Sequence, residues 1–143
     1  MKTIIFDLDG TLVFLSPRLV CIANVILLTE LRKRYDFALV TGSSKEEVLN
    51  ALKGCGLTEL FDPTLLVTRD DVSDDKASGA PFFEIKKRLT NQMVMIGDSV
   101  GDEIGSNKAA IPFVKVKSAD ELELQRASFE ESVSQAVHIL ETE

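Results

Sequence analysis

The sequence predicts an α/β fold in which a doubly wound parallel sheet carries helices on both faces. Runs rich in β-branched residues alternate with segments of helical periodicity, and the connections between them are only a few residues long. The chain has 143 residues, of which 45% are hydrophobic and 27% charged. This size and balance indicate one globular domain, spanning residues 1–143, that is large enough to bury a core.

Five short apolar runs are expected to form the strands of this sheet. They lie at residues 2–7, 36–41, 64–68, 92–97 and 113–116. In open parallel sheets, ligands bind at the carboxyl ends of the strands. The residues that follow these runs are therefore the first candidates for a functional site.

Helices are expected between the strands, over residues 17–35, 45–54, 79–89 and 100–110, with a last one near the C-terminus. Ser16 is the expected cap of the first helix, with Pro17 in the first helical position. Capping boxes are expected at Ser44 for the second helix and at Ser128 for the last. The apolar face of the last helix is predicted at Phe129, Val133, Ala136, Val137 and Leu140.

Charge and hydropathy argue against several classes of protein. Acidic residues outnumber basic ones 23 to 16, and a net charge of −7 disfavours binding to nucleic acid or to an anionic membrane surface. The longest apolar run, Leu19–Leu28, has ten residues, whereas a membrane span needs about 20. The N-terminus lacks the apolar segment of a signal peptide. Cys21 and Cys55 have no metal or redox spacing and are interpreted as reduced core thiols, so a cytoplasmic location is expected.

Four aspartates are expected to meet at one edge of the sheet. Asp7 and Asp9 follow the first strand. Asp98 follows the fourth strand, and Asp102 lies one helical turn further on. Clustered carboxylates raise one another's pKa unless a cation relieves the repulsion, and an all-oxygen ligand set suits a hard ion. The sequence therefore predicts a Mg²⁺ site formed by these aspartates.

The same segments carry the motifs of a known superfamily. The four motifs occur in order as Asp7-Leu8-Asp9-Gly10-Thr11, Thr41, Lys76 and Gly97-Asp98-Ser99-Val100-Gly101-Asp102. Over roughly residues 2–115 the chain resembles the haloacid dehalogenase superfamily, which has a Rossmann-like core. The loop at residues 67–71 is most similar to hydrolases of the phosphoglycolate-phosphatase type.

The resemblance implies a phosphatase that works through a phosphoaspartate intermediate. It assigns the role of nucleophile to Asp7, because a carboxylate both attacks phosphorus and leaves again readily. Asp9 would protonate the leaving oxygen and then deprotonate the attacking water. Thr41, Gly42 and Lys76 would hold the phosphoryl oxygens.

The resemblance also implies how the expected Mg²⁺ ion is held. Its ligands would be Asp7, the backbone carbonyl of Asp9, and Asp98. Asp102 would contribute directly or through contacts to the other ligands. The second acid at position 9 favours phosphoryl chemistry over dehalogenation, so the expected substrate is a small phosphorylated metabolite.

The segment after Lys76 departs from the pattern of the superfamily. Relatives usually continue with Pro-x-Pro, whereas residues 77–81 of this chain read Ala-Ser-Gly-Ala-Pro. Because Gly79 adds conformational freedom, a more mobile loop is expected. Lys45 is the fallback for the phosphate-binding lysine, although it lies on a capped helix.

Neither interval that holds a cap domain in this superfamily is long enough for one here. Asp9 to Thr41 spans 32 positions, and Thr41 to Lys76 spans 35. The chain therefore resembles the capless members, whose open sites accept large substrates or borrow a neighbouring subunit as a lid. The helix at 17–35 is apolar nearly all round from Leu19 to Leu28, so either the last helix covers it or it forms a homo-oligomer interface.

Other functions remain as alternatives. A receiver-type signalling domain also combines acids, threonine and lysine on such a sheet, but it carries its acceptor after the third strand. A catalytically quiet binding relative is a second alternative, because Ala77 and Gly79 replace the usual prolines. A phosphatase of macromolecules would suit an open site, although the charge of −7 disfavours a nucleic-acid substrate.

Overall fold

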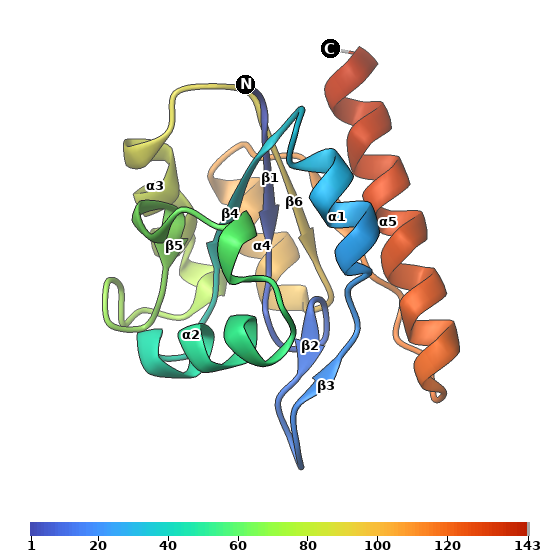
Figure 1. Cartoon of the computed structure of the whole chain (residues 1–143). Coiled ribbons are helices and arrows are strands. Elements are labelled where there is room, and N and C mark those ends of the chain that lie inside the picture. The colour runs from blue at the N-terminus through green and yellow to red at the C-terminus, as the bar shows by residue number, and fades with distance from the viewer. Residues whose placement is uncertain (143) are drawn as a thin grey trace.

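The computed structural model describes residues 1–142 and has a five-stranded parallel sheet at its centre (Figure 1). Its strands are β1 (Thr3–Phe6), β4 (Asp36–Val40), β5 (Leu66–Val67), β6 (Met93–Gly97) and β7 (Phe113–Lys115). All five predicted strands are confirmed, each with ends within two residues of the prediction. The spatial order is β5-β4-β1-β6-β7, so the residues that follow β1 lie between the ends of β4 and β6.

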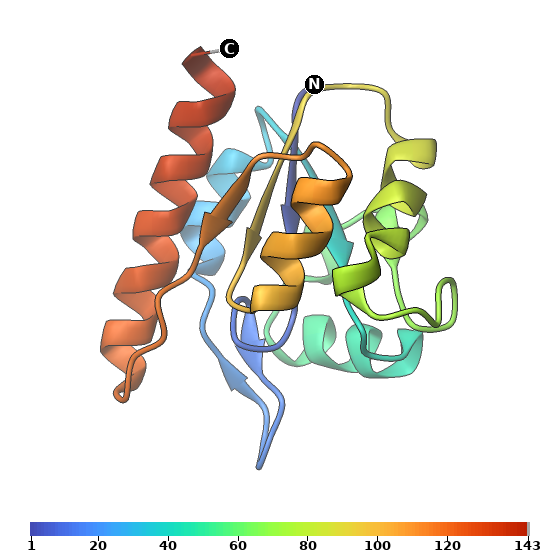
Figure 2. The same ribbon diagram turned by 180° about the vertical axis from the view of Figure 1, so that it is seen from behind.

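Helices cover both faces of the sheet, as the predicted doubly wound fold requires. They are α1 (Val25–Leu31), α2 (Lys45–Gly54), α3 (Ala80–Arg88), α4 (Val100–Lys108) and α5 (Leu122–Thr142). The views from the two sides show α1 and α5 on one face and α3 and α4 on the other (Figure 2). Short 3₁₀ turns add η1 (Thr58–Leu60), η2 (Pro63–Leu65) and η3 (Lys76–Ser78). Neither interval examined for a cap contains an extra domain, so the capless core is confirmed.

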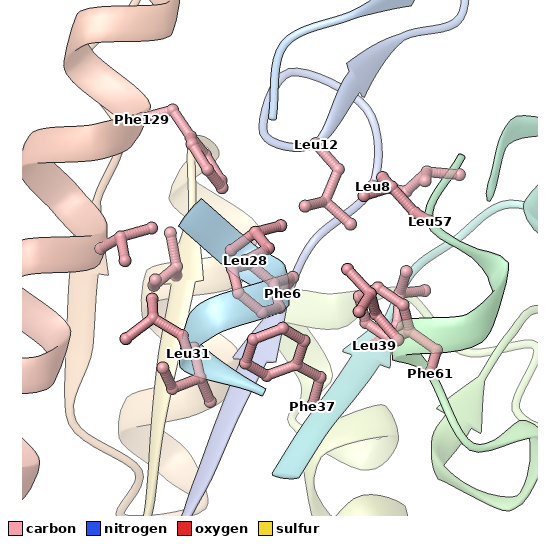
Figure 3. Close-up of a cluster of buried hydrophobic side chains, with 14 of the residues drawn as sticks. Phe6, Leu8, Leu12, Leu28, Leu31, Phe37, Leu39, Leu57, Phe61 and Phe129 are labelled. Atoms are coloured by element: carbon pink, nitrogen blue, oxygen red, sulfur yellow. The ribbon is translucent and has the colours of Figure 1, made fainter. Parts of the chain in front are cut away.

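Alternating residues of β1 contribute to two separate cores. Ile5 points to the α3 side, where it packs in a cluster with Phe82. Phe6 points to the other side, where its ring lies 5.2 Å from that of Phe37 and 6.1 Å from that of Phe129 on α5 (Figure 3). Because side chains alternate across a strand, the central strand is anchored on both faces, and this fixes the position of its carboxyl end.

The helix predicted over 17–35 is wrong at both ends, because the observed helix α1 covers only Val25–Leu31. Residues 13–21 instead form an antiparallel hairpin of β2 (Val13–Phe14) and β3 (Val20–Cys21). Helix α1 begins only after Asn24, whose side chain accepts a hydrogen bond from the Leu27 N–H at 3.1 Å. This cap lies inside the apolar run that suggested one continuous helix, and it divides the run into strand and helix.

The apolar residues of α1 are largely accounted for within the chain. Leu28 and Leu31 are buried in the core that α5 also lines, so the alternative in which the last helix covers this segment describes the fold. Ile26 remains 80% exposed. A homo-oligomer through this segment stays a prediction.

The last helix begins earlier than its predicted cap. Helix α5 starts at Leu122, so Ser128 lies inside it and its hydroxyl donates to the Lys117 carbonyl at 2.7 Å. The Ser128 side chain therefore ties the helix to the preceding loop instead of capping it. The predicted apolar face is confirmed as buried, except that Val137 is only half-buried.

The interpretation of the cysteines as reduced thiols is wrong. Cys21 on β3 and Cys55 after α2 form a disulfide with their Cα atoms 5.7 Å apart. The hairpin folds over the end of α2, where Leu19 packs against Gly54 and brings the two cysteines together. The disulfide removes one support for the expected cytoplasmic location, which stays a prediction. None of the helices within residues 1–142 combines the length and apolarity that a membrane crossing requires.

Candidate active site

Three carboxylates meet at the carboxyl edge of the sheet. Asp7 directly follows β1, and its backbone N–H donates to the Ile96 carbonyl of β6 at 3.0 Å. Asp98 directly follows β6, and Asp102 lies in the first turn of α4. One oxygen from each of the three carboxylates lies within 4.8 Å of the others. The predicted convergence of these aspartates is therefore present.

Lys76 contacts two of these three carboxylates. Its Nζ lies 2.5 Å from Asp7 Oδ1 and 2.7 Å from Asp102 Oδ1. The backbone around the lysine is ordered by η3, because Asp75 caps that turn by accepting from the Ser78 N–H at 3.0 Å. Lys76 therefore reaches the predicted site although the usual prolines are missing.

A glycine on α4 lets the lysine loop approach the helix. A Cβ added at Gly105 would lie 1.9 Å from the Lys76 carbonyl oxygen, so no other residue fits there without a shift. The fallback residue, Lys45, is exposed at the start of α2, and its backbone N–H donates to Asp70. Lys76 is thus the lysine that the fold brings to the carboxylates.

Both oxygens of Asp102 are engaged by the protein. Oδ1 accepts from Lys76, and Oδ2 accepts from the Ser99 backbone N–H at 3.3 Å. In return the Ser99 hydroxyl accepts from the Asp102 N–H at 3.0 Å, which completes a capping box at the start of α4. Asp102 is fully buried. Its observed contacts are with Lys76 and with the start of α4, and its part in holding a metal ion stays a prediction.

The Asp9 side chain points away from the three carboxylates. It is exposed, and its Oδ1 accepts from the Leu15 N–H of the hairpin at 3.0 Å. The metal-ligand cluster of residues 1–142 does not include the Asp9 carboxylate. This leaves the Asp9 side chain exposed and outside the group of carboxylates that could hold a metal ion.

The segment after β4 supplies polar groups that suit a phosphoryl group. Thr41 is buried, and its hydroxyl accepts from the Ser43 N–H at 3.1 Å. Gly42 is exposed, with no atom within 4 Å of the place a Cβ would occupy. Both residues precede the N-terminus of α2, where the helix dipole favours an anion. The N–H groups of Ser44, Lys45 and Glu47 at that end already donate to protein oxygens.

A further positive charge would stabilise the ionised carboxylates of this cluster. Burial raises the pKa of Asp7 well above its usual range, and the Asp102 charge adds to the rise while Lys76 opposes it. Burial and the Asp102 charge likewise raise the pKa of Asp98. Burial alone would lower the pKa of Lys76, but the Asp7 and Asp102 carboxylates outweigh it and raise that pKa.

The residues present fit a divalent cation. Three carboxylates face one lysine, so the cluster holds an excess of negative charge, and the donor set is all oxygen. Mg²⁺ prefers such ligands and would relieve the repulsion that raises the pKa of the aspartates. Asp7 and Asp98 are the side chains best placed to hold it, because protein donors already engage both oxygens of Asp102.

A comparison with protein families shows the family to which this chain belongs. The model of the haloacid dehalogenase-like hydrolases matches residues 24–116, which include Thr41, Lys76, Asp98 and Asp102. The chain belongs to this family. The matched range begins after Asp7. Asp7 nevertheless contacts Lys76, which lies within that range. Among curated protein sequences, none matches the chain.

Several solved structures share the fold of this haloacid dehalogenase-like hydrolase. A structure from Thermotoga maritima assigned as a β-phosphoglucomutase is 17% identical and covers 94% of this chain and 99% of its own, with a TM-score of 0.74. CbbY from Rhodobacter sphaeroides, in complex with phosphate, is 15% identical and covers 82% and 86%, with a TM-score of 0.68. YfnB from Bacillus subtilis, bound to magnesium, is 19% identical and covers 64% and 41%, with a TM-score of 0.52.

One buried polar residue beside the site was not predicted from the sequence. Gln125 is 2% exposed, and its side chain donates to the carbonyl of Gly10 at 3.1 Å. A signal for it exists, because Gln125 precedes Phe129 by four positions and therefore continues the apolar stripe of α5. Because the predicted helix begins at Ser128, Gln125 lies outside it and is not counted in its apolar stripe.

Proposed function

We propose that this hydrolase is a Mg²⁺-dependent phosphomonoesterase that acts through a phosphoaspartate on a small phosphorylated metabolite. The observation that carries the proposal is the contact of Lys76 with both Asp7 and Asp102, beside Asp98, at the carboxyl edge of the sheet. Family membership, the phosphate complex of CbbY and the magnesium complex of YfnB support the same chemistry.

Asp7 is oriented for attack by two donors on one of its oxygens. Oδ1 accepts from the Leu8 N–H at 2.7 Å and from Lys76 at 2.5 Å. These bonds fix the carboxylate plane and leave Oδ2 as the proposed nucleophile. Attack of Oδ2 on phosphorus forms the aspartyl phosphate and expels the alcohol oxygen of the substrate.

Asp9 donates and accepts the transferred protons in this mechanism. Its exposed carboxyl group would give a proton to the departing alcohol oxygen. The resulting carboxylate would then take a proton from water, and that water would attack phosphorus to release inorganic phosphate and restore Asp7. The hydrogen bond from the Leu15 N–H holds Asp9 on the solvent side, where both the leaving group and water arrive.

Charge stabilisation comes from the groups that surround the phosphoryl oxygens. Lys76, the Thr41 hydroxyl and the Gly42 backbone N–H would bind these oxygens as negative charge shifts onto them. A Mg²⁺ ion held by Asp7, Asp98 and the Asp9 carbonyl would supply additional positive charge there.

Phosphate release from p-nitrophenyl phosphate tests this function. We expect turnover in Mg²⁺, loss of turnover in excess EDTA, and recovery when Mg²⁺ is restored. Asp7→Asn should abolish turnover, whereas Asp36→Asn, at the opposite end of β4, should not. Turnover that survives EDTA or Asp7→Asn would contradict the proposed mechanism, and failure of the protein to hydrolyse this ester or a panel of phosphorylated metabolites would favour the quiet binding alternative.

A further inference from the structure

We infer that Gln125 is a positioning residue that holds the catalytic loop, the segment with Asp7, Asp9 and Gly10 that follows β1, in its working geometry. The inference rests on the proposed function and adds a residue that none of the family motifs contains. Gln125 lies in the first turn of α5, 115 positions from the loop that it contacts.

Both the nitrogen and the oxygen of the Gln125 amide form hydrogen bonds. Nε2 donates to the Gly10 carbonyl at 3.1 Å, and Oε1 accepts from the Ala119 N–H at 2.8 Å. The residue is 2% exposed, so water does not replace these bonds readily. A glutamine amide offers both a donor group and an acceptor at this length. A carboxylate only accepts hydrogen bonds when ionised, so it would repel the Gly10 carbonyl.

Gly10 is the point at which the loop touches the metal-binding carboxylates. Its φ of +81° is a left-handed conformation, and its N–H donates to the Val13 carbonyl at 2.7 Å. A Cβ at this position would lie 2.2 Å from Asp98 Oδ2, so the Gly10 backbone packs directly against that carboxylate. Asp9 precedes Gly10, and any shift of this peptide moves Asp9 relative to Asp98.

The same end of α5 also holds the hairpin that follows the loop. The Arg126 guanidinium donates to the Cys21 carbonyl of β3 at 3.0 and 3.3 Å. Neighbouring residues of α5 thus hold both the Gly10 turn and the hairpin whose Leu15 N–H orients Asp9. Because a misplacement of about 1 Å can cost about 10²-fold in rate, loss of the Gln125 contact is expected to slow catalysis.

The test compares Gln125→Met with Ser132→Ala. Methionine keeps the length and burial of glutamine but lacks both hydrogen bonds. Ser132 is a matched control because it is buried on the same helix and its hydroxyl donates to the Lys115 and Ser128 carbonyls, on β7 and α5 and not on the catalytic loop. The two variants lose comparable buried polar contacts, so a purely structural role predicts similar effects.

We expect Gln125→Met to lower kcat at least 10-fold with KM changed less than 3-fold, and Ser132→Ala to leave both constants close to those of the wild type. Gln125→Asn should be intermediate, because the shorter amide reaches only one partner; it also serves if the methionine variant does not fold. Equal kcat in all variants, or a fall that follows the unfolding midpoint in both Gln125→Met and Ser132→Ala, would overturn the inference.

Amide hydrogen exchange provides a readout that does not depend on turnover. Exchange of the Gly10 N–H should be at least 10-fold faster in Gln125→Met than in Ser132→Ala, because the Gly10 turn is no longer held. If the wild type hydrolyses no phosphate ester, the proposed function fails, yet this exchange still decides whether Gln125 holds the loop. Unchanged protection at Gly10 in Gln125→Met would refute the inference whatever the activity.

Discussion

The disulfide between Cys21 and Cys55 is predicted to supply a large share of the stability of this fold. It joins the hairpin to the end of α2, at the place where Leu19 packs on Gly54. The perturbation is its removal, either by reduction with dithiothreitol or by the double substitution Cys21→Ala/Cys55→Ala. Neither treatment replaces a residue of the candidate active site, and the quantity to be measured is the free energy of unfolding.

The magnitude follows from the loop that the bond closes. The two cysteines are 34 positions apart. A cross-link of this span lowers the entropy of the unfolded chain by about 13 cal/mol/K, which is about 4 kcal/mol at 25 °C. Domains of this size have total stabilities of about 5–15 kcal/mol, so the loss is a substantial fraction of the whole.

Urea unfolding followed by circular dichroism measures the effect. With an m-value of about 2 kcal/mol/M, the loss corresponds to a midpoint lowered by about 2 M. The double variant is its own control, because dithiothreitol should leave its midpoint unchanged. A change below about 1 kcal/mol on reduction, in protein whose disulfide is verified by mass spectrometry, would refute the entropic reasoning. Two titratable thiols in protein purified without reductant would show that the bond does not form.

Three further perturbations test individual contacts. Lys76→Met should lower kcat by about 10²–10³-fold in the phosphate-release assay, because it removes a donor to the phosphoryl group, and unchanged kcat would contradict this role. Gly10→Ala should abolish Mg²⁺-dependent turnover, since its Cβ would lie 2.2 Å from Asp98 Oδ2, and a fully active variant would show that the contact is not needed. Burial and the hydrogen bond to Glu141 raise the pKa of Tyr35. Its protonated form therefore stabilises the fold below about pH 10, and this stability is lost as pH rises through the folded-state pKa. Urea unfolding of Tyr35→Phe at several pH values should show a smaller loss above pH 10 than the wild type, and parallel losses would contradict the shift.

The strands and the site were predictable because their signals are local. Each strand is a short apolar run, and the acids that follow β1 and β6 meet because parallel strands end at one edge of the sheet. The Lys76 position also followed from the motif order, although its loop lacks the usual prolines. The turn that carries Lys76 has other local contacts: Asp75 caps it, and Gly105 leaves room for the Lys76 carbonyl.

The features that sequence reasoning missed depend on contacts between distant segments. The hairpin at 13–21 packs against the end of α2, and no local sequence pattern predicts that packing. Helical propensity and the Ser16-Pro17 pair favoured a helix there, but tertiary packing decides between the two states. The disulfide depends on the same packing, so the spacing of the cysteines alone gave the wrong interpretation. Gln125 was missed because its partner, Gly10, lies 115 positions away.

The proposed mechanism requires phosphorylation of Asp7, and direct detection of that adduct tests it. The enzyme is mixed with ³²P-labelled phosphate ester and Mg²⁺, quenched in acid within the first turnover, and digested for peptide mapping. We expect a hydroxylamine-sensitive label on the peptide that contains Asp7, absent in Asp7→Asn and absent in EDTA. Steady phosphate release without any label on Asp7, or with the label on another residue, would contradict it.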